Sequence, residues 1–341
     1  MNPEIKFIET KSWSKVEWLK FRDQGLGGSE ISTIFGLNPY KSKLQLHLEK
    51  SGQWPNETPD NFYMYRGKTT EDLIVEAYWK LYTDSPESVL INAANPEFEK
   101  KKCDNFEGYF VNPQFPHLFA SPDRIMPIGH IHRGTGEVLS TESILEVKNT
   151  RSQETAKYES GISPAFMAQT QHYMLVLDLK YAEIILLKDS TFPEVVYFER
   201  SDEFCEAIVE QSKLFWDNVL RARELMAMPQ TPDVQQELVM LEPSAEGGEA
   251  YLDFIKDRYK DQEKGITAVG ADEQYGWAVE MAKATAEKKK AEVEELLHGN
   301  KIKNFMLQGG FEQLDFVDNE FLRLKKDVNG IFRFTNKVKV Q

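Results

Sequence analysis

Two spacings of apolar residues divide this chain into expected helices and expected strands. The clearest helical pattern covers 202–226, where Phe204, Ile208, Phe215 and Val219 recur on one face at intervals of four or seven residues. Serine N-caps and helix-breaking glycine or proline set the expected ends of the other helices. Those helices are expected within 12–50 (two, opened by Ser29 and Ser42), from Gly67, from Pro164, and over 249–265 and 272–298.

Short apolar runs with period-two alternation predict the strands. Ile144–Lys148 alternates, so Leu145 and Val147 should face one side of a sheet, and Glu146 and Lys148 the other. A strand–turn–strand excursion, 126–143, is expected just before it. The other expected strands are Ser88–Ile91, Gly108–Val111 and Phe119–Ala120 within 86–125, and a closing pair at 181–187 and 195–198.

A proline-bounded stretch, 229–243, predicts a boundary between a first domain, 1–228, and a C-terminal extension, 229–341. The extension is expected to hold a helical hairpin and a β-hairpin, because Asn329-Gly330 separates two alternating runs. Basic residues of that hairpin are candidates for contact with DNA or a partner: Arg323, Lys325, Arg333, Lys337 and Lys339.

The composition is that of a globular chain, with 41% hydrophobic and 12% aromatic residues among 341. We expect a cytoplasmic protein without a signal peptide or membrane span, because no long apolar segment occurs and Cys103 and Cys205 stand far apart. The net charge of −14 does not favour nucleic-acid binding. A DNA-binding reading therefore requires basic residues to be gathered in one channel.

The candidate chemistry centres on Pro122-Asp123 and Glu146-Val147-Lys148. Two carboxylates offer hard oxygen ligands for Mg²⁺, and a lysine beside them can polarise a water or a scissile phosphate. The pattern suits metal-dependent hydrolysis of a phosphodiester. Taken alone, such a pattern more often marks an exposed strand face that carries a cross-strand ion pair.

Arg22 and the glycine-rich run Gly27-Gly28-Ser29 form a second candidate site. Backbone N–H groups at a helix start favour an anion, and an arginine adds a forked donor pair, so a terminal phosphate could bind there. A glycine-rich turn with an ordinary N-cap is the alternative. Glu71 is expected in the first turn of a helix, where an acid can be only a dipole partner, and Gln169 can face either the catalytic strand or solvent.

Five short motifs, taken in their order along the chain, resemble those of the YqaJ-like viral recombinase family, which is lambda-exonuclease-like and belongs to the PD-(D/E)XK nuclease superfamily. The resemblance covers about 12–225, and the C-terminal extension lies outside it. It implies an α/β fold with a restriction-endonuclease-like core, a central mixed sheet flanked by helices. The motifs are Arg22…Gly27-Gly28-Ser29, Gly67-Lys68-Thr69-Thr70-Glu71, Ser121-Pro122-Asp123, Glu146-Val147-Lys148 and Gln169-Thr170-Gln171.

The resemblance also implies a Mg²⁺-dependent double-strand DNA exonuclease that resects 5′ strands, with two metal ions in the site and Mn²⁺ able to substitute. Asp123, Glu146, the Val147 carbonyl and Glu71 resemble metal ligands. Lys148 resembles the residue that activates water, and Gln169 matches a further active-site position. The residues that resemble a 5′-phosphate pocket are Arg22, Gly28 and Ser29.

The partners that the resemblance implies are double-stranded DNA ends, a single-strand annealing protein and further copies of the chain in a ring-shaped trimer. The setting that it implies is the cytoplasm of a bacterial host cell. The spacer from Asp123 to Glu146 is longer than in the exonuclease of bacteriophage lambda, the best-known member of the family, which is consistent with an inserted hairpin. A structure-specific endonuclease on the same core and a non-catalytic DNA-binding or assembly protein are the alternative functions.

Overall fold

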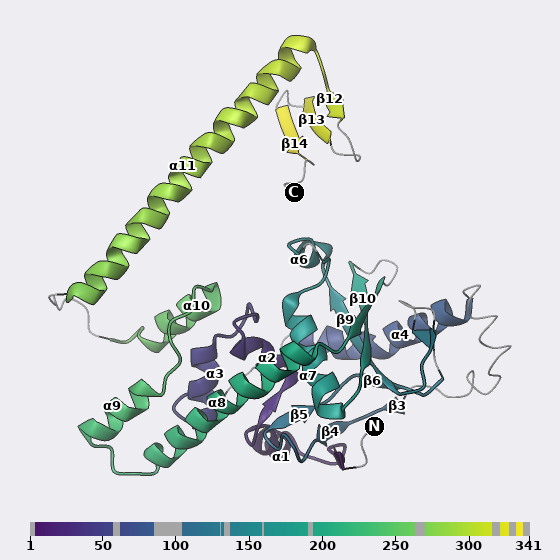
Figure 1. Ribbon diagram of the computed structural model, residues 1–341, viewed down its shortest axis with the longest axis vertical. Helices are drawn as coiled ribbons and strands as arrows, with labels where there is room; N and C mark the ends of the chain where they lie inside the picture. Colours follow the sequence, from purple (N-terminus) through teal and green to yellow (C-terminus); the bar gives the residue numbers. More distant parts are fainter. Residues whose placement is uncertain are drawn as a thin grey trace. The chain divides into compact units, whose positions relative to one another are not determined.

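The computed structural model describes residues 4–56, 62–84, 104–129, 131–132, 137–158, 160–189, 194–262, 270–315, 321–326 and 332–336. The chain divides into two compact units, Met1–Asp261 and Gln262–Gln341 (Figure 1). The helices of the first unit are α1 (Lys15–Arg22), α2 (Gly28–Ile34), α3 (Lys43–Ser51), α4 (Phe62–Asp84), α6 (Ser152–Thr155), α7 (Pro164–Leu177), α8 (Asp202–Met226), α9 (Pro232–Met240) and α10 (Glu249–Arg258). Its strands are β1 (Lys6–Glu9), β2 (Leu26–Gly27), β3 (Asp104–Asn105), β4 (Gly108–Val111), β5 (Leu118–Ala120), β6 (Arg124–Met126), β7 (Ile131–His132), β8 (Glu137–Val138), β9 (Ser143–Thr150), β10 (Tyr181–Lys188) and β11 (Glu194–Glu199).

A mixed sheet with strand order β11-β10-β9-β6-β3 lies at the centre of the first unit. Strands β9 and β10 are parallel, while β11, β6 and β3 run antiparallel to their neighbours. Since parallel strands need a crossover, the chain passes through α6 and α7 between β9 and β10. A second sheet, β1-β4-β5-β2, lies beside α2 and α7 in the fold.

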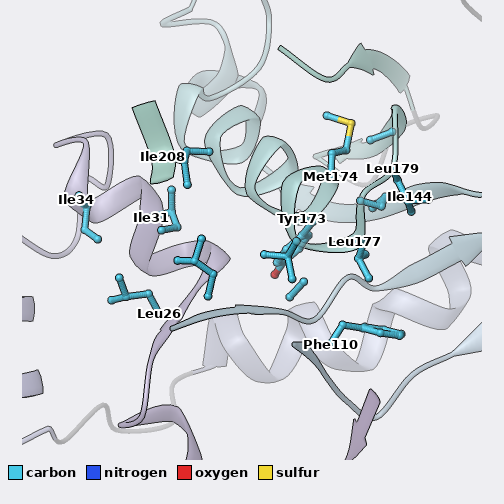
Figure 2. Packing of buried hydrophobic residues seen from close by; sticks show 14 of the residues in the cluster. Leu26, Ile31, Ile34, Phe110, Ile144, Tyr173, Met174, Leu177, Leu179 and Ile208 are labelled. Atoms are coloured by element: carbon cyan, nitrogen blue, oxygen red, sulfur yellow. The ribbon is translucent and has the colours of Figure 1, made fainter. Parts of the chain in front are cut away.

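Helices cover both faces of the central sheet, because β9 sends alternate residues to opposite sides. Leu145 and Val147 pack with Ile74 and Tyr78 of α4. Ile144 points the other way, into the main core with Tyr173 and Met174 of α7 and Ile208 of α8 (Figure 2). This arrangement confirms the predicted α/β fold, with a central mixed sheet flanked by helices.

Most predicted elements of the first unit occur where they were expected, and α8 has the predicted bounds. The expected Ser29 N-cap is wrong: α2 begins at Gly28 with Gly27 as N-cap, because the Glu30 carboxylate reaches back to the Gly27 N–H. The helix expected from Gly67 begins earlier, at Phe62. Residues 12–50 hold three helices rather than two, since α1 precedes the glycine-rich run, and α6 interrupts the loop expected over 149–163.

The boundary between the two compact units follows Asp261, whereas the sequence predicted a domain boundary after residue 228. Helix α9 packs Leu238 against Ala222 and Leu225 of α8, and α10 packs Phe254 against Leu44 and Leu48 of α3. Both helices therefore belong with the first unit, because they bury apolar faces on it.

The second unit contains α11 (Asp272–Gly309) and a sheet of β12 (Gln313–Asp315), β13 (Phe321–Lys326) and β14 (Phe332–Asn336). Helix α11 extends beyond the expected end at residue 298 and stops at Gly310, whose φ of 66° is left-handed. Met306 packs with Leu322 and Leu324. The antiparallel pairing of β13 and β14 fits the predicted hairpin. No helix in the described part of the chain is long and apolar enough to cross a membrane.

Some expectations fall outside the described residues. These are the strand Ser88–Ile91, Cys103, His130, the turns at Gly134-Thr135-Gly136 and Asn329-Gly330, and Lys337 and Lys339. The ends of the 126–143 excursion are described, and β7 and β8 pair antiparallel there, as expected.

Candidate active site

The register of the central sheet brings Asp123 and Glu146 together. Arg124 of β6 pairs with Leu145 of β9, so the next position along the ladder sets Asp123 opposite Glu146. The Asp123 Oδ2 atom accepts a hydrogen bond of 2.7 Å from the Val147 N–H. Because the 126–143 excursion leaves and returns between these paired strands, its length does not change this pairing.

Glu146 is a buried carboxylate whose Oε1 atom has two side-chain donors. Lys148 Nζ lies 2.5 Å away, and Gln169 Nε2 of α7 lies 2.8 Å away. The same Gln169 nitrogen also donates to the Tyr173 hydroxyl at 2.9 Å. As predicted, Glu146 and Lys148 share one face of β9, and Gln169 faces them. Gln171 of the same motif instead contacts backbone atoms of Glu199 and Ser201.

The electrostatics of this cluster come from burial and from close negative charges. Burial and, next, Asp123 raise the pKa of Glu146 to about 7, against the opposing effect of Lys148. Burial disfavours charge on Lys148, but Glu146 and Asp123 outweigh it and raise the lysine pKa. At neutral pH the lysine is therefore a cation, and Glu146 is close to its midpoint of ionisation.

Glu71 approaches this cluster from α4 but is held by an arginine. Arg124 Nη1 contacts the Glu71 carboxylate at 2.5 Å, and its Nη2 contacts Asp72 at 2.5 Å. Burial and, next, Asp123 raise the pKa of Glu71. Glu71 stands in the third turn of α4, not in the first turn as expected, because the helix begins at Phe62.

Arg124 is a residue that the motif reading missed. It is only 3% exposed, and it also donates to the carbonyl of Asp123. Arg124 could have been found because it directly follows the motif aspartate and lies within a strand, β6, whose residues are all buried. A buried arginine needs carboxylate partners, so its position predicts acidic side chains nearby.

The predicted phosphate pocket lies at the end of α1 and the start of α2, next to α7. Arg22 Nη2 contacts Glu30 at 3.2 Å, while the Gly27 N–H, expected to be available for an anion, donates to Glu30 at 2.7 Å. A Cβ atom on Gly28 would lie 2.6 Å from the Tyr173 ring and 2.8 Å from Gln169 Cγ. The start of α2 is thus pressed against the residues that contact Glu146.

A cleft of about 660 Å³ opens onto Asp123 and Glu71. Its lining combines three lysines, Lys11, Lys15 and Lys68, with aromatic side chains and with four carboxylates, Glu71, Asp72, Glu107 and Asp123. The lining as a whole is therefore not basic. A smaller cavity of about 220 Å³ is lined by Ser29 and Gln169, among others. The site therefore lies between this cleft and a smaller cavity.

The side chains fit a divalent cation. The Glu146 Oε2 atom is buried and has no hydrogen-bond partner among the described residues. Such an oxygen is costly to bury unless a ligand binds it, and Mg²⁺ prefers carboxylate oxygen. Within the described ranges, no three His, Cys, Asp or Glu side chains group in a metal-holding arrangement. Asp123, Glu146 and a main-chain carbonyl are the available donors, with Glu71 retained by Arg124.

Comparison with known proteins assigns this region to a family. Residues 17–180 match the model of the YqaJ-like viral recombinase domain. The matched range contains the candidate site residues from Arg22 to Tyr173. Lys11, Trp13 and Lys15 of the cleft precede it, and β10, β11, α8 and all that follows lie beyond it.

Sequence similarity to another protein extends beyond the YqaJ-like domain. The uncharacterized protein YqaJ of Bacillus subtilis (strain 168) is 26% identical over 260 residues, which is 73% of this chain. The chain spans 65% of the length of that relative.

Solved structures similar to the chain include an alkaline exonuclease (LHK-Exo) from Laribacter hongkongensis and a phage-related exonuclease from Haemophilus somnus 129PT. The first is 15% identical with a TM-score of 0.45, covering 62% of this chain and 96% of the exonuclease. The second is 13% identical with a TM-score of 0.38, covering 58% and 95%.

Proposed function

We propose that this protein is a Mg²⁺-dependent 5′-to-3′ exonuclease that resects linear duplex DNA and leaves 3′ single-stranded tails for annealing-type recombination. The observation that carries the proposal is the meeting of Asp123, Glu146 and Lys148, with one buried Glu146 oxygen that has no hydrogen-bond partner among the described residues. Membership of the viral recombinase family supports the recombination role.

Asp123, Glu146 and the Val147 carbonyl would hold the metal, with Mn²⁺ as a substitute for Mg²⁺. Glu71 joins them only if it leaves Arg124. Bound Mg²⁺ would supply positive charge for the scissile phosphate and polarise a water for attack. The Val147 N–H fixes one Asp123 oxygen, and Gln169 fixes one Glu146 oxygen, so the second oxygen of Glu146 would be the one to bind the metal.

Lys148 acts as a fixed cation beside the reacting phosphate. Its raised pKa keeps it charged at neutral pH, so it neutralises charge that develops in phosphoryl transfer rather than taking up a proton. The ring of Phe166 lies 5.2 Å from its nitrogen and limits where the side chain can point. This is an electrostatic role that the adjacent carboxylates alone cannot perform.

The 5′ end of the duplex would bind at Arg22, Gly28 and Ser29, while Lys11, Lys15 and Lys68 of the larger cleft would contact the backbone. Such a pocket gives direction, since only a chain end can occupy it. We further propose a single-strand annealing protein as partner and a ring-shaped trimer as the working form, in the cytoplasm of a bacterial host. The viral recombinase family name supports this setting.

One assay tests the proposed function. Linear duplexes carrying a label at one 5′ or one 3′ end are incubated with Mg²⁺, with closed circular duplex of the same sequence as the control. We expect release of the 5′ label as mononucleotide, a persistent 3′-labelled strand and an intact circle. Cleavage of the circle would instead identify an endonuclease, and no hydrolysis with Mg²⁺ or Mn²⁺ would leave a DNA-binding protein.

A further inference from the structure

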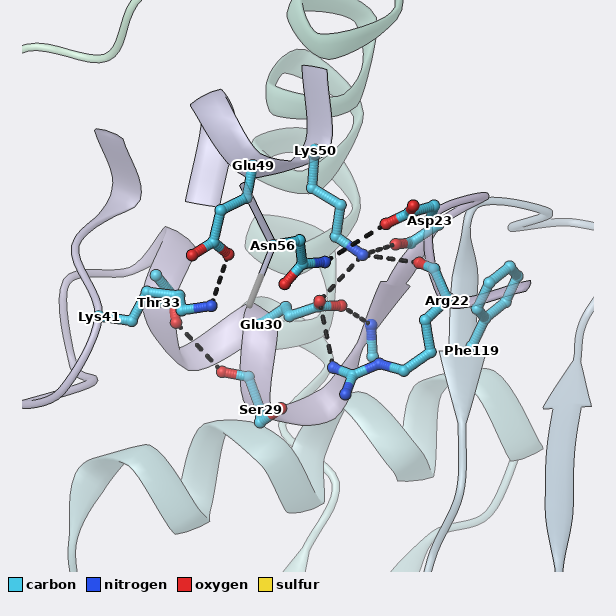
Figure 3. A network of polar contacts seen from close by, with 12 residues as sticks. Arg22, Asp23, Ser29, Glu30, Thr33, Lys41, Glu49, Lys50, Asn56 and Phe119 are labelled. Carbon is cyan, nitrogen blue, oxygen red and sulfur yellow. Dashed lines mark hydrogen bonds and ion pairs between the residues drawn. The ribbon is translucent and has the colours of Figure 1, made fainter. Parts of the chain in front are cut away.

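Three charged side chains from three helices meet behind the proposed phosphate pocket (Figure 3). Arg22 ends α1, Glu30 lies in the first turn of α2, and Lys50 lies near the end of α3. The Glu30 Oε1 atom is 3.2 Å from Arg22 Nη2 and 2.9 Å from Lys50 Nζ. One carboxylate is thus shared between two cations.

Lys50 is buried and its donors are fully engaged. Its side chain is 1% exposed, and the nitrogen also donates to the carbonyls of Arg22 at 2.6 Å and Gly25 at 2.9 Å. An ammonium group has three N–H donors, so the three contacts use all of them. Lys50 therefore fixes the backbone on both sides of the turn that follows Arg22, and it has no donor left for a ligand.

Arg22 is the member of the group that a ligand can reach. Its side chain is 29% exposed, compared with 12% for Glu30, and its guanidinium lies 4.9 Å above the Trp18 ring. The ring and the Glu30 carboxylate orient the guanidinium from two sides. Because Glu30 is shared with Lys50, the three groups together keep one net positive charge. With Arg22 and Glu30 alone the net charge would be zero.

We propose that Lys50 and Glu30 are positioning residues that make the Arg22 pocket selective for a phosphorylated 5′ end. The inference rests on the proposed function, since the ligand is the DNA end that such an exonuclease would take. A terminal phosphate carries close to two negative charges near neutral pH, whereas an internal phosphodiester carries one. A pocket that holds its arginine without cancelling the positive charge favours the terminal group.

The test is binding without metal, so that it does not depend on hydrolysis. Fluorescence anisotropy in EDTA compares one duplex with 5′-phosphate or 5′-hydroxyl ends, and the ratio of the two Kd values gives the preference. We expect Lys50→Met to lower the preference at least tenfold. Lys41→Met is the matched control, because Lys41 pairs with Glu49 at 2.5 Å and is not part of the group at Arg22. It should keep the wild-type preference.

The double variant Glu30→Gln/Lys50→Met separates charge from position. It keeps the net charge of the group at +1, through Arg22, and it removes the two most buried charges of the group together, so it should fold even if Lys50→Met does not. We expect its preference to fall well below wild type because Arg22 is no longer held. Wild-type preference in folded Lys50→Met, or in the double variant, would overturn the positioning role.

The wild-type protein distinguishes this inference from the proposed function. A wild-type chain that binds both ends equally would refute the pocket itself. A chain with a strong 5′-phosphate preference, lost in Lys50→Met, would support the positioning role even if the Mg²⁺ assay found no exonuclease. Hydrolysis from the 5′ end with an unchanged preference in Lys50→Met would overturn the inference and leave the exonuclease intact.

Discussion

At the scale of single residues, Glu146 has two oxygens in opposite situations. Its Oε1 atom accepts from Lys148 and Gln169, while Oε2 is buried with no hydrogen-bond partner in the described part of the chain. A fold that held Glu146 only as an ion pair would be expected to bond both oxygens. The asymmetry favours a ligand-binding carboxylate over the simple strand ion pair that the sequence also allowed.

Replacing Lys148 tests this distinction. We expect Lys148→Met to lower Mg²⁺-dependent hydrolysis by about 100-fold or more, because a fixed charge at the reacting phosphate is lost. DNA-end binding should remain, since Arg22 and the lysines of the larger cleft are untouched. Single-turnover digestion and anisotropy measure the two effects separately.

Lys188→Met is the matched control for this change. Lys188 lies on the neighbouring strand β10 and pairs with Glu194 at 2.6 Å, away from Asp123. It should digest DNA as the wild type does. Equal loss in both variants would mean that strand lysines act through stability, and full activity in Lys148→Met would remove the proposed mechanism.

The raised pKa of Glu146 gives a pH dependence with a definite sign. A carboxyl whose pKa rises from 4.5 to about 7 on folding binds more protons in the folded state, so stability is lost as pH rises through this window. By pH 8 the free energy of unfolding has fallen by at most about 3 kcal/mol. In EDTA, wild type should lose more free energy of unfolding between pH 5 and pH 8 than Glu146→Gln.

Denaturant unfolding at the two pH values measures this difference. Glu146→Gln resembles the protonated carboxyl, so the two proteins should be similarly stable at pH 5, and the variant should be the more stable at pH 8. Mg²⁺ should restore wild-type stability at pH 8 and leave the variant nearly unchanged. A parallel pH response of both proteins would contradict the raised pKa.

The sequence led to the residues whose chemistry follows from their own type and spacing. Alternation along β9 correctly placed Glu146 and Lys148 on one face. It did not lead to Arg124 and Lys50, because their roles depend on partners from distant elements. Arg124 meets Glu71 from α4, and Lys50 meets Glu30 from α2, so neither role is visible in local spacing.

At the scale of elements, the contact between α2 and α7 couples the two candidate sites. Gly28 lies against Tyr173 and Gln169, and Gln169 contacts Glu146. A side chain at Gly28 would hold the helices apart. The glycine is therefore explained by close packing rather than by an unusual backbone conformation.

Gly28→Ala is expected to lower both stability and turnover. The added Cβ would lie 2.6 Å from the buried Tyr173 ring, and forcing the helices apart should cost about 1–3 kcal/mol. Displacing Gln169 from Glu146 should lower kcat more than it raises KM. Thermal unfolding and steady-state digestion measure these effects.

Gly67→Ala is the opposite case on α4. A Cβ there meets nothing within 4 Å, so the change should stabilise the helix by about 0.5–1 kcal/mol and leave kcat unchanged. Equal stability of the two variants would show that the α2–α7 contact is looser than the packing around Gly28 indicates.

Helix starts were the least predictable elements, for a physical reason. Ser29 has the residue type of an N-cap, but the buried Glu30 carboxylate reaches the Gly27 N–H and moves the start of α2 to Gly28. Likewise, α4 continues through Gly67, because its buried face packs on β9 and β10 and this packing outweighs the local cost of glycine. Tertiary contacts decided both cases.

At the scale of the whole molecule, the division after Asp261 assigns α9 and α10 to the unit that contains the site. The prolines near residue 229 mark a turn between packed helices rather than a break between units. Helix α10 covers α3, and α3 carries Lys50. The C-terminal part of this unit therefore supports the group at Arg22 from behind.

Two truncations test this assignment. A chain ending at Asp261 keeps every apolar cluster of the first unit, so it should unfold cooperatively and digest a short linear duplex as the full chain does. A chain ending at residue 228 loses α9 and α10 and exposes Leu44, Leu48 and Leu225. By the burial of these side chains, we expect it to lose several kcal/mol of stability, at about 1.5–3 kcal/mol for each large apolar side chain.

The two chains should also differ at the pocket. With α10 absent, α3 is uncovered on one side, and the 5′-phosphate preference of the 1–228 chain should fall below that of the 1–261 chain in the same EDTA binding assay. A Lys41→Met variant of the longer chain controls for loss of positive charge near α3. Equal cooperativity and equal preference in the two truncated chains would place the functional boundary at residue 228 and make α9 and α10 dispensable.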